Sequence, residues 1–255
     1  MNPLRPDPRG DSMSRSILEK GLERLQNELC DFGALVHHTI VESIEVLRNR
    51  DIDAAKQLIN ADSVLNRKRF AIESDTLALI ARQQPLATDL RTLAAVLNIA
   101  TELERIADYS KSNARNTIKL GTQPPLTPPM NIPQMAGLVS DMLQSSLISF
   151  TGRNVEMAGE IASHDPEVDL LYEQIYRELM SSVIADPRNI ESASNLMWVA
   201  HNLERTADRA VNICERVIFT VTGEVKELDD SEPDLLEWGF PAAFHSTLNG
   251  RNNEK

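Results

Sequence analysis

Two stretches of this chain, Leu103-Glu104-Arg105-Ile106-Ala107-Asp108 and Leu203-Glu204-Arg205-Thr206-Ala207-Asp208, are nearly the same sequence. The likeness continues outside them, in pairs of identical residues at offsets of 100 or 103: Ala100 and Ala200, Ile118 and Ile218, Asp62 and Asp165, Ile72 and Ile175. Self-similarity at a near-constant period indicates a tandem duplication. Each copy of the motif therefore marks the same place in one of two similar halves.

The chain around the motifs predicts long amphipathic helices. Apolar residues recur at steps of three and four from Ile17 to Leu47, as on one buried helix stripe. A break near Asn49-Arg50-Asp51 leads to a second predicted helix, and Pro85 is placed to open a third in its first turn. The second half repeats the plan, with predicted helices over about 133–152 and 154–185 and a last one opened by Asp186-Pro187. We therefore expect an all-α protein of two tandem three-helix bundles packed side by side.

A Pro-rich stretch divides the halves, because proline fixes φ and removes a backbone donor, so no helix crosses it. The predicted organisation is a disordered tail over 1–13, a first bundle over 14–120, a linker over 121–132, a second bundle over 133–222, and an acidic, then polar tail over 223–255.

Composition narrows the class of protein. Aromatic residues make up 4% and there are only 10 glycines, which disfavours an all-β chain. The net charge of −12 makes nucleic acid and anionic lipid poor partners. No run approaches a membrane span, we expect no signal peptide, and Cys30 and Cys214 are interpreted as small core residues in a reducing compartment. A cytoplasmic protein is expected.

The motif acids form the candidate site. Glu104 and Asp108 are spaced i, i+4 and so share one face of a helix, and Glu204 and Asp208 repeat this. Residues equally far from a tight turn lie level in antiparallel helices. With turns near residues 83–84 and 185–186, Glu104 is level with Asp62, and Glu204 lies between the levels of two further acids. The predicted ligands are Asp62, Asn66, Glu104 and Asp108 in the first half, and Asp165, Asp169, Glu204, Asp208 and Asn212 in the second.

Such clusters usually hold hard or borderline cations, so Mg²⁺, Mn²⁺, iron or zinc are the expected metals. The alternative is a solvated acidic face in which Arg105 and Arg205 bridge to acids on neighbouring helices. His37 and His38 are interpreted as surface histidines. A carboxylate-bridged metal enzyme is a further alternative, although His201-x-x-Glu204 reverses the Glu-x-x-His order of di-iron bundles. Neither a Gly-rich phosphate loop nor a nucleophilic triad is visible.

One longer stretch is specific to a family. Ile80-Ala81-Arg82-Gln83-Gln84-Pro85-Leu86-Ala87-Thr88-Asp89-Leu90-Arg91, followed by the first motif, resembles the PhoU family, and 203–215 resembles its second repeat. The resemblance covers about residues 14–222. It implies a cytoplasmic, usually dimeric protein that is not an enzyme and that meets the membrane only through its partners. Those are the ATP-binding subunit of the phosphate importer and the phosphate-sensing histidine kinase.

The resemblance further implies that the chain represses phosphate uptake and the phosphate-starvation response, and that the motif acids carry multinuclear metal clusters. The sequence departs from the family at Ala107 and Ala207, where glycine is usual; alanine is the better helix former. One turn after Asp108 stands Ser112, where the second half has Asn212, so weaker metal binding is expected in the first half.

Overall fold

The computed structural model describes residues 8–123 and 126–228, and everything in this range that is regular is helical. The first half consists of α1 (Pro8–Asn49), α2 (Ile52–Gln83) and α3 (Ala87–Leu120). The second half consists of α4 (Asn131–Gly152), α5 (Val155–Ala162), α6 (Asp165–Ala185), the short 3₁₀ helix η1 (Pro187–Asn189) and α7 (Ile190–Thr222). The prediction of an all-α chain of two tandem three-helix bundles is confirmed, with the middle helix of the second bundle in two pieces.

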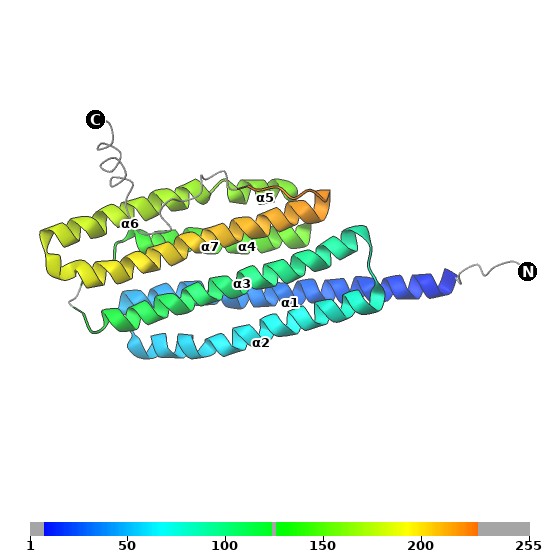
Figure 1. Ribbon diagram of the computed structural model, residues 1–255, viewed down its shortest axis with the longest axis horizontal. Coiled ribbons are helices and arrows are strands. Elements are labelled where there is room, and N and C mark those ends of the chain that lie inside the picture. Colours follow the sequence, from blue (N-terminus) through cyan, green and yellow to red (C-terminus); the bar gives the residue numbers. More distant parts are fainter. Residues whose placement is uncertain (1–7, 124–125, 229–255) are drawn as a thin grey trace, which may run out of the picture.

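The bundles lie side by side, as Figure 1 shows, with α3 next to α7 and α1 next to α4. A single apolar core runs through both halves, with Phe32 and Leu103 from the first and Phe150 and Leu203 from the second all essentially enclosed. No helix in the described ranges is long and apolar enough to cross a bilayer.

The duplication is visible in the backbone of the first turn of each half. Arg50 after α1 and Arg153 after α4 both adopt left-handed conformations, with φ of 51° and 50°. The residue after each begins the next helix as its N-cap: Asp51 accepts from the N–H groups of Asp53 and Ala54, and Asn154 accepts from that of Met157. The same local chemistry thus turns the chain at positions 103 residues apart.

Three expected boundaries differ from the structure. Helix α1 begins at Pro8, inside the predicted tail. Pro85 lies in the turn between Gln84, which is left-handed, and the start of α3 at Ala87, so it does not occupy the first turn of that helix. The predicted helix over 154–185 breaks before Asp165, because Pro166 lacks an N–H and cannot continue α5. The first repeat has Ser63 at this place, and α2 is continuous there.

The Pro-rich connection lies against both halves. Arg50 donates to the carbonyl oxygen of Leu126 at 2.8 Å, and Gln123 accepts from the side chain of Asn195 at 3.1 Å. Helix α4 then begins at Asn131, two residues before the predicted start of the second bundle at residue 133. The linker therefore forms hydrogen bonds with both bundles as well as joining them.

The two cysteines differ in environment. Cys214 is fully buried, and burial raises the pKa of its thiol to about 12, as expected of an inert core residue. Cys30 is partly exposed, so its prediction as a core residue is wrong. It lines a groove of about 250 Å³ between α1 and α4, together with Gly33, His37 and Gln144.

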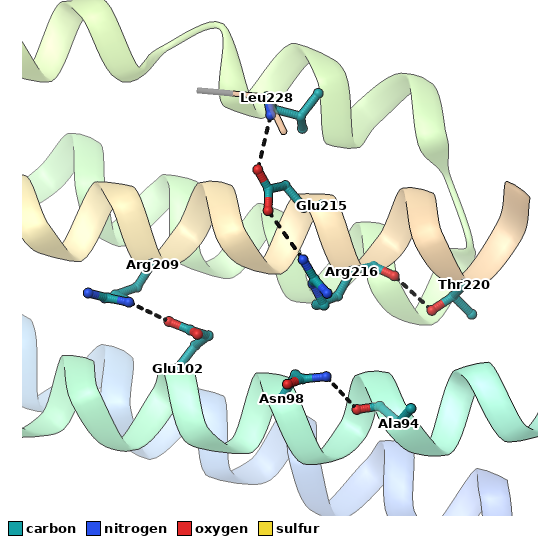
Figure 2. A network of polar contacts seen from close by, with 8 residues as sticks. All are labelled: Ala94, Asn98, Glu102, Arg209, Glu215, Arg216, Thr220 and Leu228. Atoms are coloured by element: carbon teal, nitrogen blue, oxygen red, sulfur yellow. Dashed lines mark hydrogen bonds and ion pairs between the residues drawn. The ribbon is translucent and has the colours of Figure 1, made fainter. Parts of the chain in front are cut away.

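Beyond α7 the chain turns back over its own helix. Gly223 ends α7 with φ of 82°, which suits glycine. In Figure 2 the backbone N–H of Leu228 reaches Glu215, donating to its Oε1 at 3.0 Å, while Arg216 lies 3.4 Å from Oε2. Glu215 is only 8% exposed, so these contacts satisfy a carboxylate that water does not reach freely. Of the predicted tail over 223–255, residues 229–255 lie outside the described range.

We expect Glu215→Ala to release this segment, at a cost of about 1–3 kcal/mol in the free energy of unfolding, because the Leu228 N–H loses its acceptor. Hydrogen exchange should accelerate over residues 224–228. Glu215→Gln, which keeps a side-chain oxygen in place, should lose less, and Glu227→Ala, at an exposed position, should change neither measurement. Unchanged exchange in Glu215→Ala would contradict the role given to this contact.

A second prediction concerns the close approach of α1 and α4. A Cβ at Gly33 would lie 2.1 Å from Cδ1 of Leu147. Because this methyl is the end of a flexible side chain beside the groove, Gly33→Ala should cost about 0.5–1.5 kcal/mol in rotamer strain, which offsets the gain from a helical alanine and leaves the variant no more stable than wild type. The matched control is Gly137→Ala on α4, where nothing lies within 4 Å and alanine should stabilise the helix by roughly 0.5–1 kcal/mol. Chemical denaturation of both variants measures the difference, and equal stability would argue against a tight contact at Gly33.

Candidate functional site

The two motifs lie in the middle of α3 and α7, which pack antiparallel to each other (Figure 1). Their apolar members are buried in the core: Leu103 is 0% exposed and Leu203 1%, and Ala107 and Ala207 are almost equally enclosed. The acids of each motif are half-buried on a face of the helix that is turned toward α2 or α6, away from the residues that reach the other half.

Polar contacts cross the seam from one half to the other. Arg209 of α7 reaches Glu102 of α3, with Nη1 3.4 Å from Oε2, as Figure 2 shows. Asn202 donates to the side-chain oxygen of Asn113 at 2.8 Å, and the guanidinium of Arg205 lies 5.8 Å from the centre of the Tyr109 ring. The arginines of the second motif region therefore face the other half. Arg105, by contrast, is exposed and lies 3.9 Å from its neighbour Glu104.

In the first half, the structure pairs Asp62 with two donors. Asn66 donates to Oδ2 of Asp62 at 3.1 Å, and the ammonium of Lys111 on α3 forms a short ion pair with the same oxygen. The turn lies between Gln83 and Ala87, so its centre is at residue 85. Asp62 is accordingly level with Asp108, one turn from the predicted level of Glu104, and Asn66 is level with Glu104.

In the second half, three of the predicted acids interact. The pKa of Asp208 is raised to about 7, first by burial and then by the negative charges of Glu204 and Asp165. The positive charges of Arg209 and Arg205 act in the opposite direction without cancelling this. Asp165 thus lies within electrostatic reach of the motif on α7. Asp169 is exposed, and Asn212 is half-buried one turn beyond Asp208.

Glu204 is the least satisfied of these acids. Its Oε2 is enclosed, and no hydrogen-bond donor within the described residues is aligned on it, although Nδ1 of His201 lies 3.3 Å away. His201 itself packs edge-on against Trp198, with ring centres 5.7 Å apart, and 6.4 Å from the ring of Tyr172. An enclosed carboxylate oxygen without an aligned donor is costly to bury.

The histidines of α1 lie elsewhere. His37 lines the groove between α1 and α4, and His38 lies 3.9 Å from Glu42 on its own helix.

The two halves therefore fit a metal ion unequally. Over residues 8–123 and 126–228, no three His, Cys, Asp or Glu side chains converge into a ready-made metal site. In the second half, Asp208 lies beside Glu204 and Asp165, whose carboxylate oxygens are of the kind that hard cations prefer, and Oε2 of Glu204 has no aligned donor among the described residues. In the first half, Lys111 already neutralises Asp62.

Sequence reasoning missed Lys111 and Tyr109. Lys111 follows Asp108 by three positions and Glu104 by seven, so helical spacing alone puts all three on one face. The second copy has Val211 at the position of Lys111, and this difference in charge between the copies is visible in the sequence. No sequence pattern indicates that Tyr109 lies against an arginine of the other half.

The comparisons with known proteins agree with this geometry. The chain matches the PhoU domain twice, over residues 29–117 and 132–217. The chain belongs to the PhoU family. It is 36% identical to a phosphate-specific transport system accessory protein PhoU homolog of Aquifex aeolicus over 82% of this chain and 94% of that one. It is 32% identical to the homolog of the same description from Clostridium acetobutylicum, over 86% of this chain and 100% of that one.

Solved PhoU structures share the fold. The phosphate transport system regulatory protein PhoU from Streptococcus pneumoniae superposes with a TM-score of 0.76 at 27% identity, over 82% of this chain and 99% of that one. PhoU from Pseudomonas aeruginosa gives 0.75 at 30% identity, over 81% and 99%. The second family match ends at residue 217, and the sequence continues past it to residue 255.

The raised pKa of Asp208 predicts how stability depends on pH without metal. Between about pH 4 and 7 the folded protein holds a proton that the unfolded chain has released, so the free energy of unfolding falls as pH rises through this window. Asp208→Asn removes the effect and should be more stable than wild type at pH 8, by on the order of 2 kcal/mol, but not at pH 4. Chemical denaturation of both proteins in EDTA, at pH 4 and at pH 8, measures these free energies of unfolding.

The control is Asp141→Asn, at an exposed position on α4, which should change stability by less than about 0.5 kcal/mol at either pH. A wild-type protein whose stability is constant from pH 4 to 7, or an Asp208→Asn variant less stable at pH 8, would contradict the electrostatic account.

Proposed function

We propose that this chain is a non-enzymatic accessory protein of phosphate transport, which restrains phosphate uptake and represses the phosphate-starvation response when phosphate is plentiful. The observation that carries the proposal is the match to both PhoU repeats in order, with relatives covered over 94% and 100% of their length that are described as accessory proteins of the phosphate-specific transport system.

The chain acts as an adaptor in the cytoplasm. Its partners are the ATP-binding subunit of the phosphate importer and the phosphate-sensing histidine kinase, and it reaches the membrane through them. Two features support this role. The duplication provides two similar helical units on one rigid core, and the net charge of −12 favours basic protein surfaces as partners. A homodimer would double the number of such units.

Metal binding is part of the proposed role. The acids Asp165, Glu204 and Asp208 would hold the ion, with Asn212 one turn further along α7; Mg²⁺, Mn²⁺, iron and zinc are the candidates. The bound charge would relieve the repulsion among these acids and so stabilise the second bundle at neutral pH. An adaptor whose stiffness depends on the ion could offer its partners a different surface with and without it.

Deletion of the gene should raise expression of a phosphate-starvation reporter in phosphate-rich medium, and wild-type protein should restore repression. The double variant Glu204→Gln with Asp208→Asn should restore it less well, whereas Asp141→Asn with Glu160→Gln, at exposed positions, should match wild type. Tagged protein should also retain the importer's ATP-binding subunit or the kinase. A deletion strain that stays fully repressed would overturn the regulatory role.

The carboxylate-bridged metal enzyme remains the second candidate, on the strength of the His201–Glu204 contact beside two acids. It requires redox turnover. Iron-loaded protein that consumes dioxygen, with loss of consumption in Glu204→Gln, would favour the enzyme over the adaptor.

A further inference from the structure

The junction of the two halves carries a groove between α1 and α4. Cys30, Gly33 and Ala34 line it on the α1 side, and Leu147 and Ile148 line it on the α4 side. Among the described residues that border this groove there is no Asp, Glu, Lys or Arg. Ile148 is 53% exposed although it is apolar. An uncharged groove with an exposed isoleucine on its wall favours an apolar occupant.

The size of the groove narrows the kind of occupant. Its volume of about 250 Å³ is below the roughly 300–1,000 Å³ of clefts that hold drug-sized molecules. One bulky side chain is a better match than a small-molecule ligand, and aromatic side chains bury the largest areas. The expected occupant is therefore an aromatic side chain on a segment of protein.

The chain itself carries such a segment beyond the described residues. After Leu228 the sequence is acidic over residues 229–234, and residues 235–244 are Leu-Leu-Glu-Trp-Gly-Phe-Pro-Ala-Ala-Phe. Segments that stay solvated are poor in aromatic residues, whereas this one has Trp238, Phe240 and Phe244 within seven positions. Trp238 is the first aromatic residue after Leu228, ten positions along the chain.

The last described contacts fix where this segment starts. The N–H of Leu228 donates to Glu215 and its side chain packs against the core, on the side of α7 that faces α5 (Figures 1 and 2). Glu215 lies eight residues before Gly223, about 12 Å from the end of α7. Leu147 lies five residues before Gly152, about 8 Å from the end of α4. Both helices end at the same end of the second bundle (Figure 1), so Leu228 and the groove lie at nearly the same height.

The distance around the bundle matches the length of the chain. A segment that leaves Leu228 and crosses α5 and α4 passes two neighbouring helices, whose axes are roughly 8–10 Å apart. It arrives at the groove after about 20–30 Å of surface. The ten residues from Leu228 to Trp238 span at most about 33–36 Å. Residues 229–234 are thus long enough to form most of the crossing, and Trp238 can reach the groove.

We propose that residues 235–244 dock in the groove between α1 and α4 of the same chain, with Trp238 seated between Cys30 and Ile148. The tail then runs as a strap from α7 over α5 and α4 to α1. It joins the second half to the first along α1 and α4, in addition to the contacts of α3 with α7. None of the motif residues takes part, so the docking is independent of metal binding and of the proposed role in phosphate transport.

The reactivity of Cys30 in the full-length chain tests this. Cys214 is 0% exposed and burial raises the pKa of its thiol to about 12, so a thiol reagent modifies Cys30 in the folded protein. Trp238→Ala should speed modification of Cys30 by at least about fivefold, because a seated aromatic side chain excludes the reagent. Leu248→Ala, a change in the tail outside the docked segment, should react as wild type.

Modification of Cys214 serves as the internal control, since it reports any variant that has opened its core. Equal rates for Cys30 in wild type and in Trp238→Ala would overturn the docking. The protection should also be independent of protein concentration, because the tail is tethered to its own groove. Protection that is lost on dilution would assign the groove to the tail of a second copy and would overturn docking within one chain.

Fluorescence locates Trp238 from the other side. In a Trp198→Phe background it is the only tryptophan, and its emission should lie at shorter wavelength than in the unfolded chain. Ile148→Asp places a charge on the groove wall and should move the emission to longer wavelength and increase quenching by acrylamide. Leu170→Asp, at a leucine of α6 that is 59% exposed, is the matched control and should change neither. Emission that is the same in folded and unfolded protein would contradict the proposal.

Discussion

The packing of α3 against α7 is the constraint on which the rest of the molecule depends. Arg209 reaches Glu102 and Asn202 donates to Asn113 across this seam, and Leu103 and Leu203 belong to the one apolar core that runs through both halves. The motif acids lie on other faces of α3 and α7, half-buried near α2 and α6, where burial and neighbouring acids raise the pKa of Asp208. The seam therefore fixes how α3 and α7 are rotated, and with that the direction in which the acids face.

Duplication followed by divergence accounts for the differences between the acidic clusters of the two halves. The turns after α1 and α4 have kept the same backbone and the same capping, because a left-handed residue and an N-cap are local requirements. The clusters on α3 and α7 have not stayed alike: Lys111 pairs with Asp62 in the first half, whereas its counterpart Val211 is a core residue and Asp208 lies beside Glu204 and Asp165 in the second. Corresponding positions of the two halves therefore differ in charge.

Much of this fold is predictable from the sequence, because helix spacing, capping residues and proline-rich breaks act locally. The repeated motif and the ends of α3 and α7 followed from such signals. The break at Pro166 was also signalled locally but was outweighed by the apolar pattern around it. The contacts of the site residues were harder to predict. Register counted from a turn is uncertain by about one helical turn, which moved Asp62 from Glu104 to Asp108, and no pattern within one half indicates that Tyr109 and Arg205 meet across the seam.

The contact of Leu228 with Glu215 determines where the chain leaves the folded body. Glu215 lies seven residues beyond Asp208 on α7, about 10 Å along the helix axis. The 27 residues that follow Leu228 thus start alongside the second bundle, two turns from its acids, and not at the tip of the molecule. A fluorophore attached at Leu228 is consequently held close to the acids of the second bundle, whereas one placed at the start of α1 reports on the first bundle.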